Sequence, residues 1–494
     1  MVEKGYHDLR SSLHLSDPRL RQSHLNTNTA PISGGAWRPW SRGEGRVVAL
    51  ELSPDNTFGQ PAEYTQAAML ETRLQQSRAS PCEVYLLEGL CGGLWAVLGT
   101  HLQLHPSLFM DHERLVACGT RMTGESGGLP FLPSTIDGRG HVSFKYHEPA
   151  VLSRPPRGFR NLCATSGRHL AITRLMGELS SVALCRRKCT FWCRSADSGG
   201  WTCLIICDPP IRRILTDNSG REGYDVVVTP YNSGYLDFVP LASQLETQSG
   251  PPRSSMLEDV LFYLRSHATL LDLRDPLSLR VIVEKIVASQ YLKAAEFLQS
   301  NIEIVQWSLS RKQDLARFDV SAAEEIWSDI QAWDRRAAEY QDDLEGIVLQ
   351  LHAGAAATTP GPGGWKDSAV DFRYLTARFG DIGRRGRALN SAVAALARLA
   401  GNRTSVRTAE LSLQEVERGS REARTLKALT VLGILFLPLS FLASIFSMSE
   451  RYLPGSPSFW VYLAISFPLL LFVIVVFLLV DLQCIDRFLG WHRN

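Results

Sequence analysis

The sequence predicts a membrane protein in which a cytosolic α/β domain, a long helical hairpin and a stalk helix precede two C-terminal transmembrane helices. This α+β and membrane fold class rests first on two uncharged apolar stretches, Ala428–Ser449 and Tyr452–Val480. Each is long enough to cross the hydrocarbon core of a bilayer, which takes roughly 20 helical residues. In addition, a proline-free segment with a heptad pattern leads directly into the first stretch.

The composition narrows the possible classes of protein. The chain has 494 residues, a net charge of +2 and 10 cysteines. This near-neutral charge gives no support for nucleic acid as a partner. Residues 1–46 are polar and do not resemble a signal peptide, so we expect a reducing cytosolic environment with free thiols. No P-loop and no His-Glu-x-x-His motif occurs, and we expect that the protein is not an enzyme.

The N-terminal half divides into an arm and a domain. Residues 1–45 are rich in Ser, Asn, His, Arg and Pro without apolar periodicity, and we interpret them as a disordered arm. Residues 46–255 alternate short apolar runs with Gly and Pro, which predicts a cytosolic α/β domain. The segment Ala62–Gln76 is expected to be helical. The expected strands are Val84–Leu87, Leu94–Leu98, Ala183–Cys193 and the apolar run Cys203–Ile206.

Long helices are predicted to follow this domain. Residues 256–352 contain two amphipathic runs, Pro276–Lys312 and Ser321–His352, and we expect a helical hairpin. Residues 353–364 include Thr-Thr-Pro-Gly-Pro-Gly-Gly and predict a linker. Residues 365–427 then predict a stalk helix that continues into the membrane.

The stalk helix carries a heptad repeat, which is typical of a helix that packs along a seam with partner helices. Both an intramolecular bundle and an oligomeric stalk fit this pattern. We favour the oligomeric stalk, because the helix leads directly into the membrane. The positions of the repeat, at alternating spacings of four and three, are Leu375, Phe379, Ile382, Gly386, Leu389, Val393, Leu396 and Ala400.

The C-terminal segments predict a membrane hairpin. We expect a first transmembrane helix at 428–449, an external loop at 450–458, a second transmembrane helix at 459–480 and a cytosolic tail at 481–494. Basic residues near the ends of membrane helices favour the cytosolic side. They precede the first span and follow the second, whereas the loop holds only Arg451, so we expect both termini in the cytosol. The flanking basic residues are Arg418, Arg421, Arg424, Lys427, Arg487 and Arg493.

One face of the first span combines small and hydroxylic residues. Several copies around an axis would be needed to enclose water, and we expect this face to line the pore, with leucine rings as a hydrophobic gate. Close packing between helices also explains the same small residues, and the spacing alone favours this alternative. The expected pore-lining residues are Gly433, Leu437, Ser440 and Ser444, and the expected gate residues are Leu426 and Leu429.

The first span also resembles a known family. Leu429-Thr430 is followed by Phe436-Leu437-Pro438-Leu439-Ser440-Phe441 and then by Ser447-Met448-Ser449. CorA-type magnesium transporters typically read Leu-Thr, Phe-Leu-Pro-Leu-Thr-Phe and Gly-Met-Asn along their first membrane helix. Two soluble stretches resemble the filamentous-fungal branch of that family. They are Leu104–His112 and Arg186–Trp192, the latter followed after a gap by Asp208-Pro209-Pro210-Ile211.

The resemblance implies a homopentamer in a lipid bilayer that conducts Mg²⁺, and also Co²⁺, Ni²⁺ or Zn²⁺, passively and driven by the membrane potential. It implies no cofactor, although Mg²⁺ itself can act as a regulator. Ser447, Met448, Ser449 and Glu450 would form the selectivity entrance. Because Gly-Met-Asn is replaced by Ser-Met-Ser, a non-conducting membrane scaffold or regulatory subunit is the alternative. The plasma membrane is the expected location.

Two further groups of side chains allow more than one interpretation. Cys185, Cys189 and Cys193 recur every fourth residue, as do Cys203 and Cys207, which suggests thiols on one face of two strands, either free or binding a metal. His101, His105 and His112, with Asp111 and Glu113, suggest either a metal cluster or local turn and cap roles.

Overall fold

The structure is a computed structural model, and two compact units are distinguished by their internal contacts, residues 1–397 and 398–494. It describes residues 45–76, 80–89, 91–105, 107–113, 140–154, 161–174, 181–196, 199–215, 223–231, 255–310, 320–353, 368–448 and 454–491. Apart from their boundary residues, the predicted arm (1–45) and the predicted linker (353–364) lie outside these ranges.

The first unit is built on an eight-stranded sheet with the order β11-β4-β7-β8-β3-β1-β2, in which β6 also pairs with β7. Among the described strands, β3 and β8 form the parallel pair and the other neighbours are antiparallel. A three-stranded sheet, β10-β9-β5, packs beside β4, β6 and β7. The strands are β1 (Arg46–Glu51), β2 (Ala62–Tyr64), β3 (Cys82–Glu88), β4 (His141–Leu152), β5 (Leu162–Cys163), β6 (Leu170–Arg174), β7 (Ser181–Ser195), β8 (Trp201–Cys207), β9 (Arg213–Leu215), β10 (Gly223–Asp225) and β11 (Val228–Pro230).

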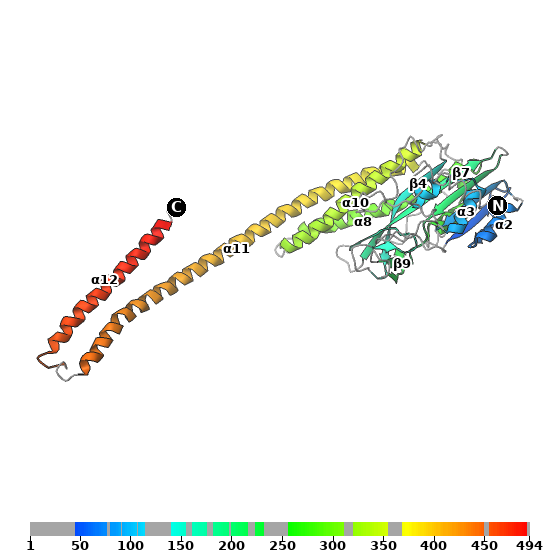
Figure 1. The fold of residues 1–494 in the computed structure, drawn as a ribbon. Helices are drawn as coiled ribbons and strands as arrows, with labels where there is room; N and C mark the ends of the chain where they lie inside the picture. Colours follow the sequence, from blue (N-terminus) through cyan, green and yellow to red (C-terminus); the bar gives the residue numbers. More distant parts are fainter. Residues whose placement is uncertain are drawn as a thin grey trace. The chain divides into compact units, whose positions relative to one another are not determined.

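Three short helices cover one face of the large sheet: α2 (Ala67–Gln75), α3 (Gly92–His101) and α4 (Ser107–Glu113) (Figure 1). The prediction of a strand at Leu94–Leu98 is wrong, because these residues lie in α3. A short apolar run buried on all sides has no period that separates strand from helix. The helix expected at Ala62–Gln76 is confirmed only for α2, since its first residues form β2.

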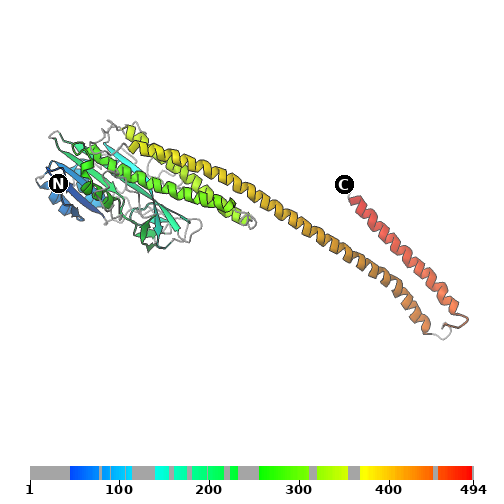
Figure 2. The ribbon, with the colours of Figure 1, turned by 180° about the vertical axis from the view of Figure 1, so that it is seen from behind.

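Longer helices cover the opposite face through the main hydrophobic core. In Figures 1 and 2, α8, α10 and the yellow first part of α11 run side by side. The predicted helical hairpin is thus confirmed as α8 and α10. The helices are α7 (Met256–Ser266), the 3₁₀ turns η3 (Ala268–Leu270) and η4 (Pro276–Leu279), α8 (Arg280–Ser310), α10 (Val320–Ala353) and α11 (Ser368–Ser447). Ser255 caps α7, because its hydroxyl accepts the backbone N–H of Glu258.

The heptad seam of α11 packs inside this unit. Its positions from Leu375 to Val393 are buried and belong to the core that includes Ile302 and Trp333. The structure therefore supports the intramolecular interpretation for this part of the seam and contradicts the oligomeric one that we favoured. The heptad repeat alone indicates only that α11 packs against partner helices. Here the partners are α8 and α10 of the same chain.

The cysteines of the sheet are free thiols in the described residues. Cys189 and Cys207 face each other with their sulfur atoms 4.0 Å apart. Cys185, however, belongs to a different hydrophobic cluster, so the expectation that all five thiols share one face is wrong.

A buried ion pair lies just past the end of β8. Arg168 donates to both oxygens of Asp208, from Nε at 2.5 Å and from Nη2 at 2.9 Å. The backbone N–H of Lys188 donates to the same carboxylate at 2.7 Å, and Nε2 of His112 lies 3.3 Å from it. Asp208 and His112 are fully buried. Burial alone would raise the pKa of Asp208, but Arg168 and His112 hold it well below its ordinary range.

The stability of the first unit is expected to fall in mild acid because of His112. Burial lowers the pKa of this imidazole from 6.5 to about 4, although Asp208 opposes the shift. Between these two values the unfolded chain binds the proton more readily than the folded one, so acidification favours unfolding. The contribution over the whole window is at most about 3 kcal/mol.

This effect is measured by urea unfolding at pH 7 and pH 4.5. We expect His112→Gln to lose clearly less stability between the two pH values than the unmodified chain, because glutamine does not titrate. Asp343 acts in the opposite direction, since burial raises its pKa to about 6, but it is present in both proteins and cancels. Equal losses in the two proteins would contradict the assignment to His112.

Candidate functional site

The second unit contains the apolar hairpin, formed by the end of α11 and by α12 (Phe459–Trp491). The apolar window of α11 has no buried residue, and that of α12 is 6 % buried. Both helices pass the length and composition test for a membrane span. Helices that are apolar all round and yet uncovered require lipid or further protein around them. The structure thus confirms two candidate transmembrane helices, although α12 continues to Trp491 beyond the predicted end at residue 480.

The predicted pore face lies on α11 with its side chains uncovered. Gly433, Ser440 and Ser444 are exposed, and Leu437 is 73 % exposed. The spacings of four, three and four residues place them on one side of the helix. Nothing within the described part of this unit packs over that side. The face is therefore available to lipid or to further copies of the chain.

The two predicted gate residues are similarly uncovered. Leu426 is 64 % exposed and Leu429 is 68 % exposed, and both lie within α11. They lie one to two helical turns before Gly433, on the same side of the helix as that residue. A ring of leucines from several copies at this height would form a hydrophobic constriction.

The hydroxyl groups of the span are partly satisfied within the helix. Thr430 donates to the carbonyl of Leu426 at 2.8 Å, and Ser440 donates to the carbonyl of Phe436 at 2.7 Å. Such bonds to the preceding turn allow a polar side chain to lie in an apolar environment at low cost. The oxygen of each hydroxyl keeps the capacity to accept a hydrogen bond from water.

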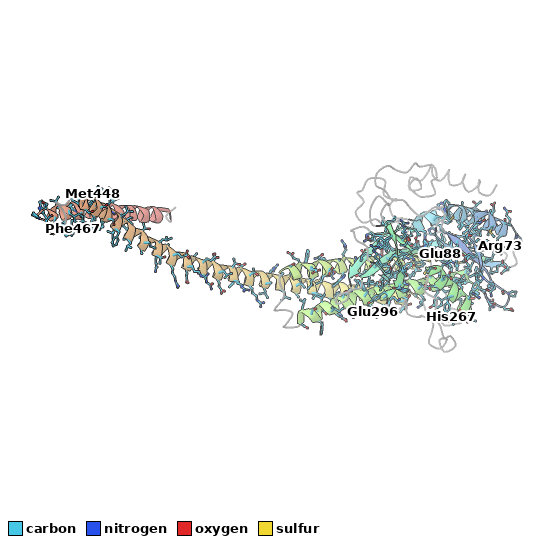
Figure 3. The ribbon with its side chains drawn as sticks, turned by 90° about the horizontal axis from the view of Figure 1, so that it is seen from below. Arg73, Glu88, His267, Glu296, Met448 and Phe467 are labelled. Carbon is cyan, nitrogen blue, oxygen red and sulfur yellow. The ribbon has the colours of Figure 1, made fainter. Side chains whose placement is uncertain are left out.

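The predicted entrance is described only in part. Ser447 is the last residue of α11, and Met448 follows it with 87 % of its surface exposed (Figure 3). Ser449 and Glu450 lie outside the described residues. The loop turns back at Gly455, whose φ of +105° strongly favours glycine.

Few side chains of α11 and α12 are in contact with each other in the described part of the second unit. Near the loop, the rings of Phe446 and Tyr462 meet edge to face at 5.6 Å, and Phe459 stacks on Tyr462. Ser466 is the one buried residue among the described side chains of this unit. A single hairpin therefore leaves most of its apolar surface without a protein partner.

Comparison with known families identifies this region. Residues 390–482 match the family model described as CorA-like Mg²⁺ transporter protein. These residues form a CorA-like domain. The match includes the predicted gate, the predicted pore face, the Ser447–Ser449 tripeptide and all of the predicted second span. CorA-family proteins are ion transporters and not enzymes, in agreement with the prediction that this chain is not an enzyme. The filamentous-fungal branch stays a prediction.

Two solved structures align with most of the chain. One is the CorA magnesium transporter from Methanocaldococcus jannaschii, at 9 % identity and a TM-score of 0.31, covering 87 % of this chain and 96 % of that one. The other is the full-length CmaX protein, at 11 % identity and a TM-score of 0.27, covering 88 % and 97 %. At these low TM-scores we infer nothing about this chain from either structure. No curated protein sequence matches the chain.

Outside the CorA-like domain, the histidines singled out in the sequence do not gather into a metal cluster in the described residues. His112 pairs with Asp208, whereas Asp111 accepts from His141 at 2.9 Å. A different group comes together instead: His147, Glu339 and Asp343. Glu339 and Asp343 are four residues apart on α10, and such a pair of carboxylates on one helix face can be recognised in the sequence. The partner, His147 on β4, is too distant in sequence to have been predicted.

Proposed function

We propose that this chain is a passive divalent-cation channel of the CorA type, with Mg²⁺ as its principal cargo and Co²⁺, Ni²⁺ or Zn²⁺ as further candidates. The observation that carries the proposal is the uncovered small-residue face of α11 within a segment that matches a CorA-like family model. No resident cofactor is required, because the transported ion is substrate. Mg²⁺ as a regulator is part of the same proposal.

Conduction requires several copies of the chain. One hairpin cannot enclose water, and its apolar surface is almost entirely uncovered. In the proposed assembly, a homopentamer, five copies of α11 surround an axis and α12 faces lipid. Gly433, Leu437, Ser440 and Ser444 then line the path, with Leu426 and Leu429 as rings nearest the cytosol.

The proposed orientation has both termini in the cytosol, and the plasma membrane is the proposed location. Basic residues at the cytosolic ends of the two helices support this orientation. The membrane potential contributes about 2.3 kcal/mol per charge per 100 mV. For a divalent ion that crosses toward the negative cytosol, this is about 4.6 kcal/mol per 100 mV, which is sufficient to drive uptake without a coupled reaction.

A non-conducting membrane scaffold is the second candidate, and the Ser-Met-Ser tripeptide favours it. Mg²⁺ gives up its water ligands reluctantly, so an entrance has to hold the hydrated ion. A serine hydroxyl is shorter than an asparagine amide and offers a weaker grip on those waters. The scaffold would share the assembly of the channel but not its flux.

Disulfide cross-linking tests the proposed axis independently of flux. Ser440→Cys is placed in a chain that also carries Cys484→Ser, which removes the native cysteine of α12. Membranes that contain this protein are oxidised with copper phenanthroline. We expect covalent dimers, because the position 440 side chains of neighbouring copies converge on the axis. Leu442→Cys is the matched control, because two residues rotate a helix by about 200° to its opposite side. Stronger cross-linking at 442 than at 440 would contradict the proposed pore face.

A further inference from the structure

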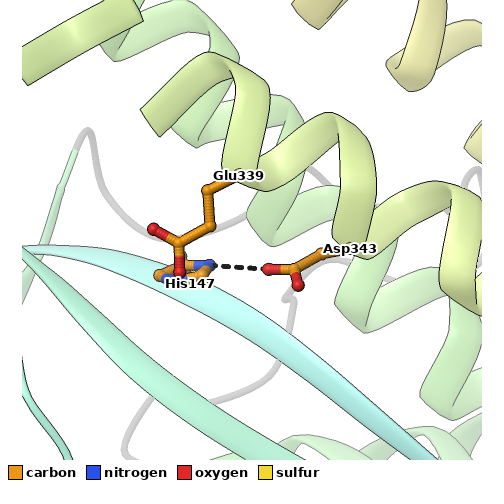
Figure 4. A group of neighbouring side chains, drawn as sticks. All are labelled: His147, Glu339 and Asp343. Atoms are coloured by element: carbon orange, nitrogen blue, oxygen red, sulfur yellow. Dashed lines mark ion pairs between the residues drawn. The ribbon is translucent and has the colours of Figure 1, made fainter. Parts of the chain in front are cut away.

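A group of potential metal ligands lies in the first unit, where α10 crosses β4 (Figure 4). Glu339 and Asp343 are one helical turn apart on α10 and both point toward His147 of β4. One nitrogen or oxygen atom from each residue lies within 4.8 Å of the others. This group, His147, Glu339 and Asp343, is called the β4–α10 cluster below.

The imidazole of His147 is buried and directed at the two carboxylates, as a metal ligand would be. The residue is 2 % exposed, and its ring lies against that of Tyr340 with centroids 4.3 Å apart. Its Nδ1 atom points at Asp343 Oδ2 at 4.0 Å, too far for a hydrogen bond, and accepts or donates none among the described residues.

A cation is already held between the carboxylates. The ammonium of Lys145 lies 3.1 Å from Glu339 and 3.0 Å from Asp343. Arg186 adds a second positive charge, 2.7 Å from Glu339. Lys145 keeps 24 % of its side-chain surface exposed, and Glu339 keeps 30 %. The lysine therefore has access to solvent, and the cluster has an open side through which a hydrated ion can approach.

We infer that the β4–α10 cluster is a binding site for a first-row transition-metal cation, such as Ni²⁺, Co²⁺ or Zn²⁺, which exchanges with the Lys145 ammonium. One imidazole and two carboxylates suit these ions, whereas Mg²⁺ prefers oxygen ligands alone. Three protein ligands leave room for water at the open side. A tetrahedral ion about 2.1 Å from each ligand atom needs those atoms about 3.4 Å apart. The ligand atoms now lie within 4.8 Å of one another, and rotation of the Glu339 and Asp343 side chains would bring them to this shorter separation.

This site is separate from the proposed channel function. It lies in the first unit, and binding there requires no flux through the membrane. Because the ligands come from β4 and from α10, a bound ion would tie the helical hairpin to the sheet. The exchange with Lys145 predicts modest affinity in the unmodified chain and tighter binding once the lysine is removed.

The test counts bound Ni²⁺ in the purified full chain, in detergent, without a polyhistidine tag. The protein is stripped with a chelator, kept reduced and dialysed against increasing Ni²⁺ with excess Mg²⁺, and bound nickel is measured by mass spectrometry. His147→Gln removes the nitrogen ligand and Lys145→Leu removes the competing ammonium. His141→Gln is the matched control, since His141 is also a buried imidazole of β4 but bonds to Asp111 outside the cluster.

We expect one saturable Ni²⁺ per chain that His147→Gln weakens by at least about tenfold, as is usual for the loss of one metal contact. Lys145→Leu is expected to tighten it by a similar factor, and His141→Gln to leave it unchanged. Identical isotherms for His147→Gln and the unmodified chain would overturn the site. If His147→Gln does not fold, Lys145→Leu decides alone, because unchanged binding there also overturns the site. Displacement by Mg²⁺ would overturn the choice of metal.

Discussion

Replacing Asp208 by asparagine is expected to lower the free energy of unfolding of the first unit by about 3–5 kcal/mol. The substitution removes the negative charge to which Arg168 donates two hydrogen bonds. Both side chains are buried, with 2 % and 0 % of their surfaces exposed, so the guanidinium loses the charge of Asp208 in a place shielded from solvent. Since domains are typically stable by only about 5–15 kcal/mol, the loss is a large fraction of the total.

Denaturant unfolding of the full chain, followed by tryptophan fluorescence, measures this loss. Asp381→Asn is the matched control, because it removes the same charge from an ion pair with Arg384 in which both side chains are more than half exposed. Exposed pairs are worth at most about 1 kcal/mol. A similarly small change for Asp208→Asn would mean that the buried pair does not stabilise the unit.

Replacing Leu437 by asparagine is expected to raise the rate of Mg²⁺ uptake by about tenfold or more, if the chain conducts as proposed. In the proposed pore, Leu437 side chains form a ring that excludes water from the narrow path. An amide in this position hydrates the ring, and each 1.4 kcal/mol removed from a barrier corresponds to about a tenfold higher rate. The residue is 73 % exposed in the single chain, so the substitution disturbs no packing within it.

Dye-loaded liposomes that contain each purified variant measure this rate. Leu435→Asn is the matched control, since Leu435 precedes Leu437 by two residues and therefore lies on roughly the opposite side of α11. It makes the same change in polarity away from the proposed axis. Equal rates for the two variants, with the same oligomer in both, would show that Leu437 does not face the path.

The long helices were the most predictable part of the fold. The runs Pro276–Lys312 and Ser321–His352 appear as α8 and α10, with ends within a few residues of those expected. Helical periodicity over such lengths leaves little ambiguity. By contrast, Leu94–Leu98 forms a helix and not the expected strand, because an apolar run of five residues is compatible with either.

Partner identity was not predictable from the sequence. The heptad positions Leu375–Val393 pack against helices of the same chain, although the pattern fits another subunit equally well. In the β4–α10 cluster, the i, i+4 carboxylates of α10 are visible in the sequence, but His147 joins them only through the tertiary fold. The buried pair of Arg168 and Asp208, 40 residues apart, was missed for the same reason.

Mg²⁺ uptake into liposomes shows whether the hairpin conducts divalent cations despite the Ser447–Ser449 tripeptide. The purified chain is reconstituted with a magnesium-sensitive dye inside and a potential that is negative inside, and protein-free liposomes provide the baseline. Ser447→Gly combined with Ser449→Asn rebuilds Gly-Met-Asn and is measured in parallel. We expect potential-driven uptake by the unmodified chain and faster uptake by the double variant. Intact oligomers that admit no Mg²⁺, Co²⁺ or Zn²⁺ in either form would contradict the channel and support the scaffold.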